Sequence, residues 1–286
     1  MLDEILNPID ILPRLPLGSA VDSFIDWLLA EIGWLTRLIA NFLESIMDGI
    51  TDVLLWFPPF ILILIIALIA WRLSNRNIAI FTFFGLLLIY NMNLWPAAMS
   101  TITMILIAVT ISLCIGLPVG ILSTRYTLFH RIVWPRLDFM QTMPAFVYLI
   151  PAVFFFSLGV VAAMIATVVF SMPPVIRLTG LGIRQVPEDV VEASHAFGAT
   201  DWQLLTKVQL PLAMPTIMAG VNQCIMLALS MVVIAAMIGA GGLGGHVYGA
   251  IQRLNIGLGF ESGLAVVILA IILDRITQSS RETSEE

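Results

Sequence analysis

Apolar residues in this sequence gather into long runs that are separated by short polar segments. A helix needs roughly 20 apolar residues to cross a hydrocarbon core of about 30 Å, and most of the runs approach that length. The pattern therefore predicts an all-α polytopic membrane protein with about seven transmembrane helices. We expect them over residues 58–73, 78–95, 97–123, 142–158, 160–183, 212–238 and 262–276.

The N-terminal region has a different pattern. Residues 1–20 are rich in proline and are expected to be irregular, whereas residues 21–55 alternate between a polar and an apolar helical face. Too many charges interrupt this stretch for a membrane span, and its tryptophans suit headgroup depth. We expect an amphipathic helix lying in the membrane interface. A helix packed on the flank of the protein itself fits the same pattern.

Composition agrees with the pattern of runs. The chain has 286 residues, of which 59% are hydrophobic and 11% are charged, and its mean hydropathy is +1.01. So few charges cannot cover a water-soluble domain of this size. The absence of a basic stripe argues against nucleic acid as a partner. Cys114 and Cys224 stand in separate apolar runs, where we expect both to be buried small residues.

Prolines stand in or beside some of the predicted spans and not others. Pro144 and Pro151 bracket the fourth span, Pro173 and Pro174 are expected to interrupt the fifth, and Pro118 stands late in the third. Helix breaks at membrane depth are tolerated beside protein or a water-filled cavity, so these spans are candidates to line a pore, although a simple packing kink is the alternative. The glycine-rich residues 239–259 are too polar to span and are expected to form a short, gate-like helix.

A polar segment between the fifth and sixth spans, residues 187–211, carries local helix signals. Pro187 is followed by two acidic residues, a combination typical of a helix start. Gly198 is suited to end that helix in a left-handed conformation. Thr200 and Gln203 then have the spacing of a capping box for a second helix. The segment is thus expected to form two short helices around a glycine corner.

The order of residues in this segment resembles the EAA loop of ABC-importer permeases. In that family the loop is a coupling helix that docks into a separate ATPase subunit. Serine replaces the usual third-position alanine, and valine replaces the usual isoleucine. A plain surface helix-turn-helix is the alternative. The resemblance implies that the ATPase-coupling residues are Glu192, Ala193, Ser194, Gly198, Leu210 and Pro211.

A more specific resemblance covers about half the chain. Residues 141–151, 173–179, 208–223 and 269–275 are similar to the glycine betaine/proline betaine permeases. This resemblance implies a type I ABC importer permease fold in a bacterial cytoplasmic membrane. It also implies a second permease copy, two cytosolic ABC ATPases that carry ATP and magnesium, and an external substrate-binding protein. No cofactor is expected in this chain.

The resemblance suggests a division of the chain and a substrate path. We expect an external tail over residues 1–56, the permease domain over 57–278 and a short cytosolic tail over 279–286. A quaternary ammonium group is held best by aromatic faces. Rings in the fourth predicted span could supply them, although lipid-facing or core packing is the alternative for each. These substrate-path candidates are Phe146, Tyr148 and Phe155.

The sequence lacks the residues that ATP hydrolysis, metal binding or proton coupling would need. The only lysine is Lys207, and no phosphate-binding loop with a lysine can be formed around it, so we expect no ATP hydrolysis by that route in this chain. The three histidines are far apart, and no metal or nucleophile arrangement stands out. The rival transport hypothesis is an ion-coupled secondary carrier for a small amine or amino-acid-like solute. Carboxylates at Asp138, Glu261 and Asp274 stand at span edges rather than mid-span, which argues against proton coupling.

The positive charges predict an orientation. If residues 187–211 face the cytosol, ten of the thirteen basic residues fall on or near the cytosolic side. Such an excess is typical of cytoplasmic loops. The expectation is an external N-terminus, a cytosolic C-terminus and a cytosolic coupling loop.

Overall fold

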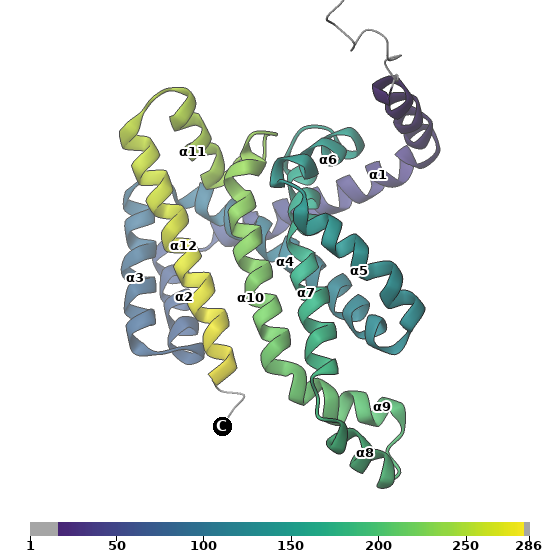
Figure 1. Cartoon of the computed structure of the whole chain (residues 1–286). Helices are drawn as coiled ribbons and strands as arrows, with labels where there is room; N and C mark the ends of the chain where they lie inside the picture. The colour runs from purple at the N-terminus through teal and green to yellow at the C-terminus, as the bar shows by residue number, and fades with distance from the viewer. Residues whose placement is uncertain (1–16, 283–286) are drawn as a thin grey trace, which may run out of the picture.

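The computed structural model describes residues 17–282, and this part of the chain is helical with short connections. Figure 1 shows the long helices packed side by side, with shorter helices at both ends of the bundle. The elements in chain order are α1 (Leu17–Trp56), α2 (Pro59–Leu73), α3 (Arg76–Asn91), α4 (Trp95–Arg125), α5 (Thr127–Thr142), the 3₁₀ turn η2 (Ala145–Tyr148), α6 (Leu149–Phe156), α7 (Val160–Arg184), α8 (Glu188–Ala196), α9 (Asp201–Leu204), the π-helical turn η3 (Leu205–Gln209), α10 (Leu210–Ala236), α11 (Gly242–Gln252) and α12 (Ile256–Glu282).

An apolar helix stands at each of the seven predicted spans, but these helices differ in whether they are long enough to cross a membrane alone. Within residues 17–282, four stretches are long and apolar enough to cross a membrane: α4, α7, the continuous run from α9 through α10, and α12. The number rises to six if two bent helix pairs each count as one span, namely α1 with α2 and α5 with α6. The helix α3 is apolar but shorter. The all-α polytopic architecture is confirmed.

The predicted span over residues 142–158 is wrong. The chain breaks at Met143, and α5 meets the η2–α6 segment at 115°. Met143 is extended, with ψ of 134°, because the ring of Pro144 disfavours the helical conformation in the residue before it. A second break follows at Ser157, which has a positive φ of 62°. Residues 142–158 therefore form only the short η2–α6 arm, which is bent away from α5 and is by itself too short to cross a membrane.

The expected interruption at Pro173 and Pro174 is also wrong. Both prolines stand inside α7, which runs without a break and buries both rings. A proline removes one helical hydrogen bond, and packing against neighbouring helices can compensate for that loss. In this protein α7 is the central helix, since α4 and α10 pack on it.

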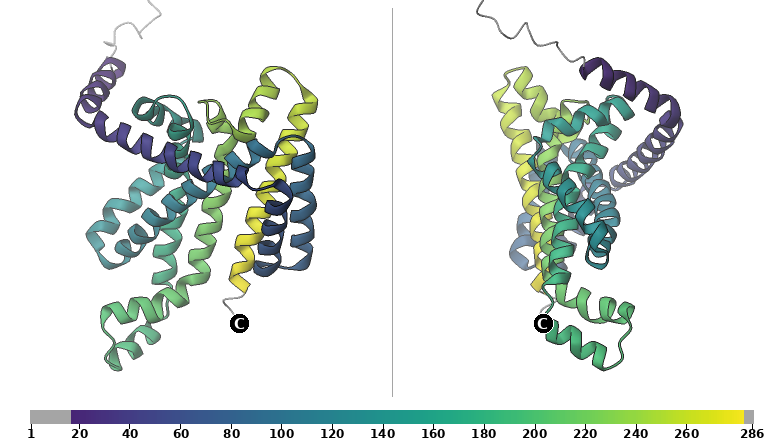
Figure 2. Two further views of the ribbon diagram at one scale, coloured as in Figure 1. Left: turned by 180° about the vertical axis from the view of Figure 1, so that it is seen from behind. Right: turned by 45° about the vertical axis from the view of Figure 1, so that its right-hand side comes forward.

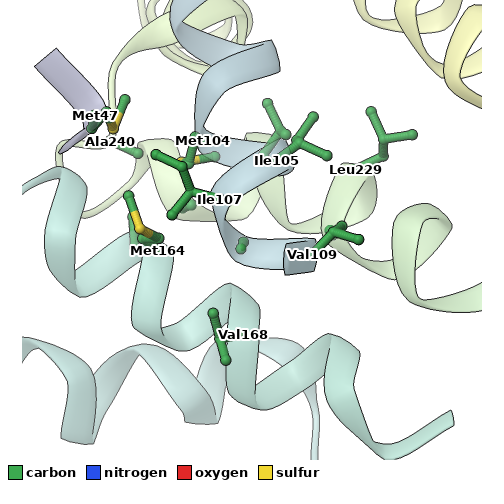
Figure 3. Packing of buried hydrophobic residues seen from close by; sticks show 14 of the residues in the cluster. Met47, Met104, Ile105, Ile107, Val109, Met164, Val168, Leu229 and Ala240 are labelled. Atoms are coloured by element: carbon green, nitrogen blue, oxygen red, sulfur yellow. The ribbon is translucent and has the colours of Figure 1, made fainter. Parts of the chain in front are cut away.

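The core is formed where α4, α7 and α10 meet, and the C-terminal part of α1 packs against it. Figure 3 shows methionine and branched aliphatic side chains from these helices interlocking. The helices approach closely through glycines, as in many membrane bundles. A β-carbon at Gly120 of α4 would lie 2.7 Å from Cβ of Thr179 of α7. Cys224 is buried in this core as expected, but Cys114 is exposed on α4, contrary to expectation.

The amphipathic helix α1 begins at Leu17, so residues 17–20 are helical rather than irregular, and residues 1–16 lie outside the described part. It meets α2 at 103° and runs across the long helices instead of along them (Figure 2). Leu43 and Met47 in its C-terminal half are buried in the core. Towards the N-terminus, Trp27 and Trp34 are 58% and 63% exposed. One half of α1 therefore packs on the flank of the bundle, and the other half offers apolar side chains outward.

The two ends of the bundle carry different elements. Figure 1 places α8 and α9, the turn between α2 and α3, and the end of α12 at one end, and α6 and α11 at the other. The glycine-rich segment does form a helix, α11. Its N-terminal end is held to α4, because the amide of Leu243 donates to the hydroxyl oxygen of Thr101 at 2.9 Å.

Candidate functional site

The helix α8 projects from the bundle with none of its residues buried (Figure 2). It begins after Pro187, and Glu188 and Asp189 occupy its first turn, where they favourably oppose the free amide groups. Glu192 and Ala193 are exposed on it. Among the side chains of residues 18–278, Glu192 makes no ion pair, so its carboxylate is available to a group outside this chain.

A Schellman motif ends α8 at the predicted glycine. Gly198 has a φ of +81°. Its amide donates to the carbonyl of His195 at 2.9 Å, and the amide of Ala199 donates to the carbonyl of Ser194 at 3.0 Å. These two bonds satisfy carbonyls that the helix end would otherwise leave free. The hydroxyl of Ser194 is also used internally, since it donates to the carbonyl of Val190 at 2.8 Å.

The second predicted helix forms and carries the predicted cap. The amide of Gln203 donates to the hydroxyl oxygen of Thr200 at 3.3 Å, and the amide of Thr200 donates to the side-chain oxygen of Gln203 at 2.9 Å. The short helix α9 then continues through η3 into α10 without a loop. The amide of Leu210 bonds the carbonyl of Leu205, and Pro211 follows with no amide hydrogen to donate.

Leu210 and Pro211 therefore occupy a different place from the other candidates. Glu192, Ala193, Ser194 and Gly198 lie together at the projecting tip, whereas Leu210 is partly buried at the base. It packs there against a small cluster, which consists of Ile183, Leu205, Ala213 and Ile217. The structure thus gives the motif two parts, an exposed tip and a packed base.

Two exposed aromatic residues on the tip were missed by the sequence reasoning. Phe197 is 93% exposed beside the glycine corner, and Trp202 is 70% exposed on α9. Large exposed aromatic side chains on a polar segment are typical of the anchors of protein interfaces. Their occurrence within an otherwise polar stretch was the available signal.

Both ends of the projecting segment are tied to the C-terminal end of α4. Where α7 ends, Arg184 donates to the carbonyl of Ser123 at 2.9 Å. Its guanidinium also lies 2.7 Å from Nδ1 of His130 and 5.2 Å from the ring centre of Trp134.

At the start of α9, a second arginine makes the other tie. Arg125 donates to the carbonyl of Asp201 at 2.6 Å and pairs with its carboxylate at 3.3 Å. The two arginines therefore link both ends of the projecting segment to α4.

Two of the three aromatic candidates for a substrate path lie together, and the third, Phe146, does not line their pocket. Phe146 is 53% exposed. Tyr148 is buried, and its hydroxyl donates to the carbonyl of Met140. Tyr148 and Phe155 line the same apolar pocket of about 120 Å³ between α6 and α7. The role of these rings in transport stays a prediction.

Comparison with known proteins identifies the family. Residues 116–280 match the family described as "Binding-protein-dependent transport system inner membrane component". The chain is 53% identical to the glycine betaine transport system permease protein OpuAB of Bacillus subtilis, over 94% of this chain and 96% of that protein. It is 48% identical to the glycine betaine/proline betaine transport system permease protein ProW of Escherichia coli, over 93% of this chain and 75% of that protein.

A solved structure supports the same assignment. An inward-facing conformation of the MetNI methionine ABC transporter matches with a TM-score of 0.57 and 25% identity, over 66% of this chain and 93% of the matched chain. The projecting segment lies within the residues that match the family model. This chain therefore belongs to the binding-protein-dependent transport system inner membrane components, the permease subunits of ABC importers, in which a separate subunit hydrolyses ATP.

Proposed function

We propose that this chain forms the translocation path of an ATP-driven importer for glycine betaine and related quaternary ammonium osmoprotectants. Relatives that are 53%, 48% and 48% identical to this chain carry names of that substrate class. The proposed coupling role rests on the exposed tip formed by α8 and α9. It offers Phe197 and Trp202 with a free carboxylate at Glu192, and it is tied to α4 at both ends. A surface of this kind suits docking of a separate ATPase.

The proposed assembly contains two copies of this permease, two cytosolic ABC ATPases that hold ATP and magnesium, and an external substrate-binding protein. The division into a tail (1–56), a permease domain (57–278) and a C-terminal tail (279–286) belongs to the same proposal. In it, the exposed tryptophans of α1 lie at the headgroup level of the membrane. The comparisons give no support to an ion-coupled carrier.

Uptake into proteoliposomes tests the energy source. We expect the purified permease alone to accumulate no glycine betaine under a sodium or proton gradient, because no carboxylate stands in the middle of the four long spans. Uptake is expected when the ATPase, the binding protein and ATP are added. Accumulation by the permease alone, driven by an ion gradient, would contradict the proposal and favour a secondary carrier.

Cysteine labelling tests the proposed orientation. The charge asymmetry and the position of α8 at the opposite end from α6 and α11 support a cytosolic tip and an external start of α1. In a background in which Cys114 is replaced by alanine, we expect an impermeant maleimide added to intact cells to label Ser19→Cys. The same reagent should not label His195→Cys until the membrane is opened. The reverse pattern would invert the orientation and remove the tip from reach of a cytosolic ATPase.

A further inference from the structure

A pocket of about 250 Å³ lies where α5, α7 and α10 meet, outside the tip and outside the apolar pocket of Tyr148 and Phe155. Two glutamines and one aromatic ring contribute to it, and no charged residue does. Its lining residues are Met140, Gln141, Phe170, Pro174, Gln223 and Leu227.

The position of Gln223 is difficult to explain by lipid contact. It stands thirteen residues from each end of α10, which puts it at the middle of this helix. Its side chain is exposed, and no hydrogen bond to it occurs among the side chains described, those of residues 18–278. A carboxamide without a partner is costly in hydrocarbon. This face of α10 is therefore expected to look onto a hydrated path.

Gln141 brings a second carboxamide to the same pocket from another helix. It is exposed near the end of α5, two residues before the break at Met143. The break is what allows the end of α5 to meet the middle of α7 and α10. Two carboxamides offer up to four N–H donors without adding charge. Such donors suit the carboxylate of a solute that must be released again.

Phe170 supplies the complementary half of the pocket. Its ring is partly buried and is held edge-on to the ring of Tyr148, with 5.5 Å between centroids. In a helix the carbonyl of Phe170 would accept from the amide of residue 173 or 174. Both residues are prolines and have no N–H to donate, so this carbonyl lacks its usual helical partner. A π-face and a backbone acceptor without that partner both attract a quaternary ammonium group.

We propose that this pocket is a transit subsite for a zwitterionic quaternary ammonium solute. The amides of Gln141 and Gln223 hold its carboxylate, and the ring and carbonyl of Phe170 hold its methylated head. The inference rests on the proposed function and adds the residues that contact the solute. A pocket without net charge matches a solute without net charge. The nearest ion pair, Arg177 of α7 with Asp138 of α5, is already neutralised within the protein.

The test measures how many ATP molecules are hydrolysed for each glycine betaine transported. The complete complex is reconstituted with a saturating amount of loaded binding protein, and Gln223→Leu and Phe170→Leu are compared with the unaltered permease. We expect uptake to fall about tenfold, the size expected from one lost hydrogen bond or cation–π contact. Binding-protein-stimulated ATP hydrolysis should persist, so that the ATP cost of each solute rises about tenfold.

Matched variants separate recognition from folding. Phe170→Tyr keeps the ring and should retain the normal number of ATP molecules hydrolysed per solute. Gln252→Leu and Phe81→Leu make the same changes outside the pocket and should also retain it.

Three results would overturn the inference. The first is an unchanged number of ATP molecules hydrolysed per solute in Gln223→Leu and Phe170→Leu. This result includes variants that lose uptake and ATP hydrolysis together, through misfolding or lost contact with a second copy. The second is an equal defect in Phe170→Tyr and Phe170→Leu. The third is the absence of ATP-dependent uptake by the unaltered complex, which would remove the proposed function together with the subsite. A normal ATP-dependent uptake with unaffected variants would remove the subsite alone.

Discussion

Gly198→Val should lower ATP-dependent uptake of glycine betaine to near background while the permease stays inserted in the membrane. Gly198 adopts a φ of +81°, and a β-branched residue in that region costs roughly 1–2 kcal/mol. Space is not the limitation, because a β-carbon at this position meets nothing within 4 Å. The strain is relieved if the Schellman motif opens, and α8 then loses its fixed angle to α9. Phe197 and Trp202 would no longer present one surface.

The control for this prediction adds the same side chain without the strain. Ala196→Val places a valine on the same exposed surface, two residues earlier and in a right-handed helical conformation. We expect it to retain most of the uptake. Both variants are compared at equal membrane levels, and co-purification of the ATPase reports docking. Normal uptake by Gly198→Val would mean that the glycine corner does not set the coupling surface.

The projecting tip could be predicted in detail because its signals are local. A capping box requires only Thr200 and Gln203 at the right spacing, and a Schellman motif requires only a glycine after the helix. Both depend on hydrogen bonds between residues a few positions apart. The amphipathic helix α1 was predictable for a similar reason, since its pattern repeats over a 40-residue helix.

The middle of the bundle was less predictable because its structure depends on distant neighbours. Prolines in α7 are accommodated by the packing of α4 and α10, whereas Pro144 coincides with a real break. The sequence shows a proline in both cases and does not show the packing. Gln223 illustrates the same limit, since a single polar residue in an apolar run acquires meaning only when Gln141 and Phe170 are found beside it.

The two arginines that tie the tip to α4 show a further limit. In the sequence, Arg125 and Arg184 contributed only to the count of positive charges that predicts orientation. In the structure, Arg125 contacts Asp201, which is 76 residues away in the chain, and Arg184 contacts Ser123, which is 61 residues away. Hydrogen-bond partners at such separations depend on how the helices pack, so the pattern of charges alone could not assign them.

Arg184→Met should uncouple ATP hydrolysis from transport. One guanidinium contacts the carbonyl of Ser123, the ring of His130 and the face of Trp134, and thereby joins the end of α7 to both α4 and α5. Methionine keeps much of the length of the side chain but none of the donors. We expect uptake to fall about tenfold, equivalent to roughly 1.4 kcal/mol, the order of one charged hydrogen bond. ATP hydrolysis should continue with a weaker response to loaded binding protein.

Arg136→Met is the matched control for this change. Arg136 lies on α5, as His130 and Trp134 do, and it donates a hydrogen bond to the carbonyl of Ile132 within its own helix at 2.8 Å. The control removes the same charge without cutting a link between helices, so uptake should be nearly normal. Arg184→Lys should be intermediate, because an ammonium keeps the charge but lacks the planar fork that reaches Ser123 and His130 while covering Trp134. Equal uptake by Arg184→Met and Arg136→Met would show that motion of the tip reaches the spans without this arginine, through the Arg125–Asp201 pair or through the continuous helix from α9 into α10.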